Sequence, residues 1–168
     1  SKLEIFWTDE RCLPPDHPES NYGMARHSLL SKVPIAEANI HRIHGELEPA
    51  QAARYYEEQL HGLGRGCDVV LLGVGEDGHT ASLFPNTAAL KEKCLWAVAT
   101  ATPRGPRVTM TLPYLNLSDN ILLLASGKAK SKIVAATAHG GEEQYPVHRL
   151  RTKSPVLWLV DQEAAAEL

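Results

Sequence analysis

The chain has 168 residues, of which 43% are hydrophobic and 22% charged, and its formal net charge is −3. This composition is typical of one globular domain with a sizeable core, and no apolar run is long enough to span a bilayer. Lysine and arginine are spread along the chain, so we expect neither a nucleic-acid nor a membrane surface. A small anionic ligand stays open, because a few converging cations suffice to bind one.

The first half of the chain predicts two strands and two helices. The predicted segments are a strand at residues 3–7, a polar turn at 8–21, a helix at 22–32, a brief strand at 39–43 and a helix within 48–66. Ser20 or Asn21 can cap the first helix, and Val33-Pro34 ends it. In the second helix, apolar residues that include Tyr56 and Leu60 recur on one face before a run of glycines.

The second half predicts further buried strands. The predicted segments are strands at residues 69–72, 94–100, 107–112, 120–126 and 154–161, a helix at 128–138 with Ala129, Ile133 and Ala136 facing inward, and a last helix at 162–168. Continuous apolar strands that alternate with helices are typical of a layered α/β fold. We therefore predict one domain, residues 1–168, with a mostly parallel sheet covered by helices on both faces.

Three cysteines, Cys12, Cys67 and Cys94, lie far apart, and none belongs to a CxxC pair. This set argues against a disulfide framework and against a zinc site. The spacing favours a reducing, cytoplasmic compartment. The HxxH formed by His41 and His44 lacks the glutamate and the helix of a metalloprotease motif, so both histidines are interpreted as structural.

Ligands of α/β sheets bind beyond the carboxyl ends of the strands. Four groups of polar residues follow predicted strands or lie in neighbouring loops: Asp9-Glu10-Arg11, Glu76-Asp77-Gly78-His79, Arg104 with Arg107, and Lys128 with Lys130. If the strands are parallel neighbours, these groups converge on one crevice. Each also has a plain structural interpretation: a solvated turn, a capped turn, a strand-edge cation and exposed helix residues.

The stretch GVGEDGHTASLFP, residues 73–85, contains a G-x-G-x-x-G pattern. A dinucleotide loop is disfavoured, because Glu76 and Asp77 place negative charge where a pyrophosphate would lie. The alternative centres on Asp77 and His79. We expect a helix to begin near Thr80, whose positive end would keep the His79 ring neutral, while a nearby carboxylate orients it as a base for water.

Five segments together resemble a known family. They are FWTDERCLPPDHPESN, DVVLLGVGEDGHTASLFP, RVTMTLPYLN, ASGKAKSK and SPVLWLVDQEAA. In this order they resemble the glucosamine-6-phosphate isomerase/6-phosphogluconolactonase superfamily, and the lactonases in particular. The resemblance implies a modified Rossmann-like fold and hydrolysis of 6-phospho-D-glucono-1,5-lactone in the pentose phosphate pathway, with no metal and no organic cofactor.

The resemblance also implies roles for six residues. His79 would be the general base, with Asp77 and Asp9 orienting it or the substrate hydroxyls. Arg11, Arg107 and Lys130 would supply positive charge to the phosphate or to the developing oxyanion; Lys130 closes the G-x-x-K pattern from Gly127. The partner would be a phosphorylated sugar lactone, and a homo-oligomer stays open.

Two departures from the family matter. Members begin with an earlier strand, a Ser-Gly-Gly-Ser-Thr-Pro-like phosphate loop and a helix, so we expect an N-terminally truncated domain with a weakened phosphate site and an exposed apolar sheet edge. In glucosamine-6-phosphate deaminases the Asp-Gly-His is followed by Ile-Ala-Phe-Asn-Glu, and the extra carboxylate falls here on Phe84. That difference favours the lactonase over a deaminase/isomerase. The missing phosphate loop keeps a non-catalytic sugar-phosphate-binding module as a third alternative.

Overall fold

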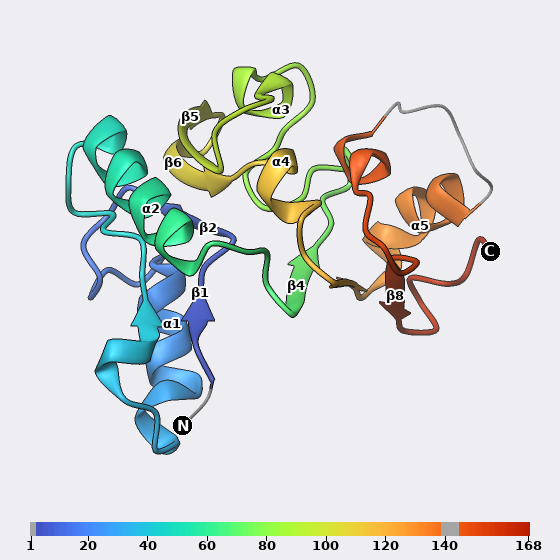
Figure 1. Ribbon diagram of the computed structural model, residues 1–168. Helices are drawn as coiled ribbons and strands as arrows, with labels where there is room; N and C mark the ends of the chain where they lie inside the picture. The colour runs from blue at the N-terminus through green and yellow to red at the C-terminus, as the bar shows by residue number, and fades with distance from the viewer. Residues whose placement is uncertain (1–2, 139–144) are drawn as a thin grey trace.

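The computed structural model describes residues 3–138 and 145–168, which form a mixed α/β fold (Figure 1). Its strands are β1 (Ile5–Phe6), β2 (Asp9–Arg11), β3 (Ile40–His41), β4 (Val69–Gly73), β5 (Ala97–Thr102), β6 (Gly105–Met110), β7 (Asn120–Ala125) and β8 (Leu157–Val160). Its α-helices are α1 (Asn21–Ser28), α2 (Pro49–Leu63), α3 (Ala88–Lys91), α4 (Leu112–Leu115) and α5 (Ser131–Ala138). Its 3₁₀-helices are η1 (Leu30–Lys32), η2 (Glu37–Asn39), η3 (Lys128–Lys130) and η4 (Pro146–Arg149).

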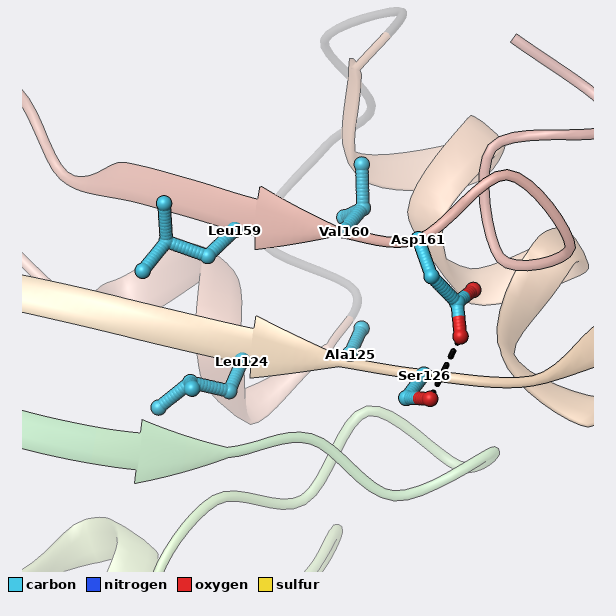
Figure 2. A pocket seen from close by; sticks show the side chains of 6 residues that line it. All are labelled: Leu124, Ala125, Ser126, Leu159, Val160 and Asp161. Atoms are coloured by element: carbon cyan, nitrogen blue, oxygen red, sulfur yellow. Dashed lines mark hydrogen bonds between the residues drawn. The ribbon is translucent and has the colours of Figure 1, made fainter.

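Three parallel strands in the order β4-β7-β8 form one sheet. These are the long apolar runs that the sequence analysis predicts as buried strands, and the α/β class is confirmed. Since parallel strands end on the same edge, the loops after β4, β7 and β8 open on one side of the molecule (Figure 2). A shorter parallel pair joins β1 to β3.

A second sheet is antiparallel, in the order β2-β6-β5. The prediction of a polar turn over residues 8–21 is therefore wrong for Asp9–Arg11, which form strand β2 against β6. Residues 101–106, predicted as a loop, are mostly the facing ends of a β5–β6 hairpin whose turn is Pro103-Arg104; Gly105, which pairs with Thr102, has a φ of +98°. Strand β2 consists of three charged residues and so lacks the apolar pattern by which strands are predicted. It forms because it pairs with β6, a segment distant in the chain.

Helices α1 and α2 begin where the sequence predicts, but α1 ends at Ser28 and not at Val33-Pro34, because residues Leu30–Lys32 form the 3₁₀-helix η1. Ser20 caps α1, its Oγ accepting a hydrogen bond from the Gly23 N–H at 3.0 Å. Helix α2 buries the apolar stripe that includes Tyr56 and Leu60, ends at Gly64 in the left-handed conformation, and packs against β5 and β6. The Tyr56 hydroxyl donates to the Trp7 carbonyl at 2.8 Å, which ties α2 to the end of β1. Within the described residues, no helix has both the length and the apolar character that a bilayer crossing requires.

Two predicted helices do not form. The segment from Thr80 is a tight turn closed by a Thr80–Leu83 bridge, and the positive φ angles of Ala81 (47°) and Asn86 (64°) are incompatible with a helix. Residues 162–167 form consecutive turns, whose start is fixed by the Asp161 carboxylate accepting the Ala164 N–H at 2.8 Å. Ala129, expected to face inward, is exposed because residues 128–130 form the 3₁₀-helix η3 instead of an α-helical turn.

The two faces of the β4-β7-β8 sheet differ in exposure. Side chains of alternate residues such as Val70, Leu72 and Leu123 are at most 3% exposed on one face. The opposite face carries a cluster of apolar side chains that we call the open face: Val69, Leu71, Leu124, Leu157 and Leu159, each 46–60% exposed. Figure 2 shows two of its members on neighbouring strands. Among the described residues, helices thus cover one face of this sheet, whereas the sequence predicts helices on both.

Candidate active site

The loop after β4 presents His79 on a tight turn. The Gly75 N–H donates to the His79 carbonyl at 2.8 Å, and the Gly78 N–H donates to the Gly75 carbonyl at 3.0 Å. A Cβ atom on Gly75 would lie 2.0 Å from His79 Nδ1, and Gly78 adopts a φ of +74°. The glycines therefore permit the close approach of His79 to the backbone, and two of their N–H groups are used inside the loop instead of facing a pyrophosphate.

His79 and Asp77 form a short hydrogen bond. His79 Nδ1 lies 2.6 Å from Asp77 Oδ1, which also accepts the His79 backbone N–H at 3.2 Å. Partial burial by itself would raise the pKa of Asp77, but the hydrogen bonds from His79 outweigh it and hold the pKa below its ordinary value. The ionised carboxylate can only accept, so in the neutral imidazole Nδ1 carries the hydrogen and Nε2 has the lone pair. This is the tautomer that a general base needs.

The surroundings of His79 differ from the expectation in one respect. No helix begins at Thr80, so a helix dipole does not act on the ring, and that part of the prediction is wrong. The ring is instead stacked on Phe84, with centroids 4.0 Å apart and planes 21° from parallel. Asp77 and Phe84 together fix the imidazole from its edge and from one face.

Asp9 lies at the start of β2 and is held by two donors. Ser82 Oγ donates to Asp9 Oδ2 at 2.6 Å, and Asn21 Nδ2 donates to Asp9 Oδ1 at 3.2 Å. The Ser82 backbone N–H also donates to Thr109 Oγ1 at 3.1 Å, on strand β6. Ser82 therefore links the segment that follows His79 to both β2 and β6. Within the described part of the chain, no hydrogen bond joins Asp9 to His79.

Arg11 and Arg107 face each other across the β2–β6 ladder. Such cross-strand partners project to the same side of a sheet, where like charges repel unless an anion lies between them. Arg107 is 8% exposed, and burial followed by the charge of Arg11 lowers its pKa. Its Nη1 is 4.0 Å from Asp9 Oδ2. The buried Nε of each arginine has no acceptor among the residues that the structure describes.

Lys130 lies in η3, in the loop that follows β7. Beside this loop, a shallow depression of about 370 Å³ is lined by Leu124, Ala125, Ser126, Leu159, Val160 and Asp161 (Figure 2). The Asp161 carboxylate accepts from Ser126 Oγ at 2.5 Å and from the Gly127 N–H at 3.0 Å, which fixes the loop. Over residues 3–138 and 145–168, no hydrogen bond or ion pair joins Lys130 to the other five predicted site residues. The depression does not include His79. We place the candidate site at Asp77, His79, Asp9, Arg11 and Arg107, because this set holds the base and the two facing cations.

The structure thus brings the predicted residues together in two groups. Asp77 with His79 and Asp9 with Arg107 are close pairs, and Ser82, three residues after His79 in the chain, bonds to Asp9. Sequence reasoning missed Ser82 and the helix-start residue Asn21 as site residues, because their bonds to Asp9 join segments far apart in the chain. No group of three or more His, Cys, Asp and Glu side chains in the described residues is arranged to hold a metal ion.

Comparison with known proteins places these residues in a family. The family described as glucosamine-6-phosphate isomerases/6-phosphogluconolactonase matches residues 1–158. The chain belongs to this family. Among its relatives, a protein from Nostoc sp. named 6-phosphogluconolactonase is 37% identical over 177 residues, covering 99% of this chain and 74% of the relative.

Solved structures agree with this assignment. The crystal structure of 6-phosphogluconolactonase from Thermotoga maritima has a TM-score of 0.86 and 30% identity, covering 95% of this chain and 72% of the other. A monomeric glucosamine-6-phosphate deaminase also has a TM-score of 0.86, but at 23% identity it shows the fold alone. Both branches of the glucosamine-6-phosphate isomerase/6-phosphogluconolactonase family therefore share this fold, and the site residues must distinguish them.

Proposed function

We propose that this chain hydrolyses 6-phospho-D-glucono-1,5-lactone to 6-phosphogluconate, with His79 as the general base. The observation that carries the proposal is the 2.6 Å pair of His79 Nδ1 with Asp77 Oδ1. It leaves Nε2 as the proton acceptor and fixes the ring while water is activated. Relatives named 6-phosphogluconolactonase at 36–37% identity over nearly the whole chain support this substrate.

The reaction follows from these groups. His79 Nε2 takes a proton from water as the water oxygen bonds to the lactone carbonyl carbon, and the carbonyl electrons move onto oxygen. When the tetrahedral intermediate collapses, the bond to the ring oxygen breaks and that oxygen takes the proton back from the imidazolium. A positioned general base typically contributes about 100- to 10,000-fold to the rate.

Three cationic residues, Arg11, Arg107 and Lys130, are assigned to bind the negative charge of the substrate phosphate or of the oxyanion. The position of Arg11 and Arg107 opposite each other on β2 and β6 supports their assignment to the substrate phosphate or to the oxyanion. Lys130 is assigned to the same task from the resemblance. Asp9, already accepting from Ser82 and Asn21, is assigned to a substrate hydroxyl and not to the ring of His79.

The deaminase alternative is disfavoured by Phe84. In deaminases the matching position carries a carboxylate, whereas here an aromatic ring stacks on His79 at 4.0 Å. His79 therefore has one carboxylate partner, Asp77, among the described residues. Ammonia release from glucosamine 6-phosphate at a rate comparable to lactone hydrolysis would contradict our choice.

Replacing the base tests the proposal. We expect His79→Ala to lower kcat for freshly prepared lactone by about 100-fold or more, because general-base help is lost, while its thermal unfolding stays close to wild type. His61 is a matched control, since it bonds to Glu57 at 3.0 Å and stacks on Trp96 at 4.0 Å outside the site. His61→Ala should keep full kcat. Lactone loss at the wild-type rate in His79→Ala would exclude His79 as the base.

The non-catalytic alternative gives a different result in the same assay. A binding module would bind 6-phosphogluconate in calorimetry without accelerating lactone loss in the wild type.

We also propose that the chain is a single domain and that it is cytoplasmic. The cytoplasmic compartment is proposed because Cys12, Cys67 and Cys94 are all free.

A further inference from the structure

Glu10 is a buried carboxylate that none of the roles above uses. It lies in β2 between Asp9 and Arg11, and because side chains alternate along a strand it points to the face opposite theirs. It is 2% exposed. A carboxylate is rarely buried to this degree unless hydrogen bonds replace its lost water.

Four donors surround the Glu10 carboxylate. Oε1 accepts the backbone N–H groups of Arg11 at 2.7 Å and Asn21 at 2.8 Å. Oε2 accepts the Tyr22 N–H at 2.7 Å and the Ser20 hydroxyl at 3.0 Å. Three of these donors belong to the first turn of α1 or to its cap, where free N–H groups and the helix dipole favour negative charge.

The same short segment also contacts the side chains on either side of Glu10. Asn21 Nδ2 donates to the Asp9 carbonyl at 2.9 Å and to Asp9 Oδ1 at 3.2 Å. The Arg11 guanidinium donates through Nη1 to the Glu19 carbonyl. All three side chains of β2 are therefore bonded to residues 19–22, and Glu10 is the buried centre of this contact.

We propose that Glu10 is a positioning residue, which docks the start of α1 against β2 and so holds Asp9 and Arg11 in the geometry that binds substrate. The kinetic consequence rests on the function proposed above, whereas the structural consequence does not. Glu10 touches no reacting atom in this scheme and acts through Asn21 and Arg11.

Glutamine is the informative replacement, because it keeps the size of the side chain. Its amide oxygen can still accept the Arg11 and Asn21 N–H groups, and the Ser20 hydroxyl can turn to accept from its NH₂ group. The NH₂ group would, however, face the Tyr22 N–H, which can only donate. We expect Glu10→Gln to move Asn21 away from Asp9 and to lower kcat/KM for the lactone by about 10- to 100-fold, the range for misplacements near 1 Å. The decrease in kcat/KM should come from a higher KM. The pH profile of kcat, which depends on the His79–Asp77 pair, should stay unchanged.

Glu57 provides the matched control. Its carboxylate also joins a helix to a strand by accepting backbone N–H groups, from Trp96 at 2.8 Å and from Ala97 at 2.5 Å. Glu57→Gln should lose stability and keep the wild-type KM. An equal rise of KM in both variants would reduce the effect to general destabilisation and overturn the proposal, as would an unchanged KM in Glu10→Gln.

A second variant and a second measurement complete the test. Asn21→Ala should reproduce the kinetic loss, and if Glu10→Gln does not fold, wild-type kinetics in Asn21→Ala overturn the proposal. The side-chain amide resonance of Asn21 should shift in Glu10→Gln and not in Glu57→Gln; no shift would overturn it too. An inactive wild type would contradict the proposed function. In that case the side-chain amide resonance of Asn21 would by itself test whether Glu10 positions the start of α1.

Discussion

At the scale of single residues, close packing around His79 decides what the GVGEDGH loop does. The glycine pattern resembles a dinucleotide loop, yet Gly75 lies against the imidazole and Asp77 bonds to it. Sequence reasoning could predict the Asp77–His79 pair, since the two residues are two positions apart in a turn. It could not predict the bond from Ser82 to Asp9, because 73 positions separate these residues.

Gly75 offers a test at this scale. A Cβ atom there would approach His79 Nδ1 to 2.0 Å, so Gly75→Ala must displace the imidazole. We expect kcat to fall by about 100-fold, as for other small misplacements of reacting groups. In Gly62, which lies in α2, a Cβ atom would meet nothing within 4 Å. Gly62→Ala should therefore keep full activity and raise the free energy of unfolding by up to about 1 kcal/mol. Wild-type kcat in Gly75→Ala would show that this packing does not position the base.

At the scale of elements, the Arg42–Glu46 ion pair fixes the loop between β3 and α2, and Arg42 also contacts α1. Arg42 follows β3 and makes a two-pronged contact with Glu46, with N–O distances of 2.6 and 2.8 Å, and its guanidinium lies 5.5 Å from the Tyr22 ring of α1. Elements with strong local signals, such as α2 and β4, are predicted correctly. Strand β2 is missed because its pairing with β6 is long-range, and the helix at Thr80 is overpredicted because positive φ angles are invisible in the sequence.

The pH dependence of stability tests the Arg42–Glu46 pair. Hydrogen bonds from Arg42 lower the pKa of Glu46 from 4.5 to about 2. A folded-state pKa below the unfolded value means that the pair stabilises the fold above pH 4.5 and loses this contribution as pH falls toward 2. After allowance for solvent screening, we expect Glu46→Gln to lower the free energy of unfolding by about 1 kcal/mol at neutral pH. Urea denaturation should show the difference shrinking below pH 4.5; a constant difference down to pH 3 would argue against it.

At the scale of the whole molecule, the open face of the β4-β7-β8 sheet is the most unusual feature. Parallel sheets are normally covered on both faces, and contiguous exposed apolar patches are uncommon on folded monomers. Leu71 is 60% exposed and Leu72, the next residue, is 2% exposed. The single exposed residue is unremarkable, but five such side chains on adjoining strands form a surface to which apolar molecules can bind.

A dye-binding measurement tests this surface. We expect the folded chain to bind 8-anilinonaphthalene-1-sulfonate at neutral pH, and Leu71→Lys combined with Leu159→Lys to reduce the fluorescence strongly. These substitutions should cost less than about 1 kcal/mol of stability, because both positions are near half exposed or more, whereas Leu72→Lys should unfold the chain by burying a charge. Absence of dye binding by the folded wild type would contradict an accessible open face.

The sequence by itself determined the α/β class, the main buried strands, the α2 stripe and the family motif around His79, because these depend on residues close together in the chain. Only the tertiary structure decided that β2 pairs antiparallel with β6, that Arg11 and Arg107 oppose each other, and that Asn21 and Ser82 hold Asp9. It also revealed which face of the parallel sheet is covered. A continuous run of apolar residues in a strand has the same sequence pattern whether one face of the sheet or both faces are buried. The physical reason is the same in each case: pairing, register and burial depend on contacts between residues distant in the chain, which local patterns do not encode.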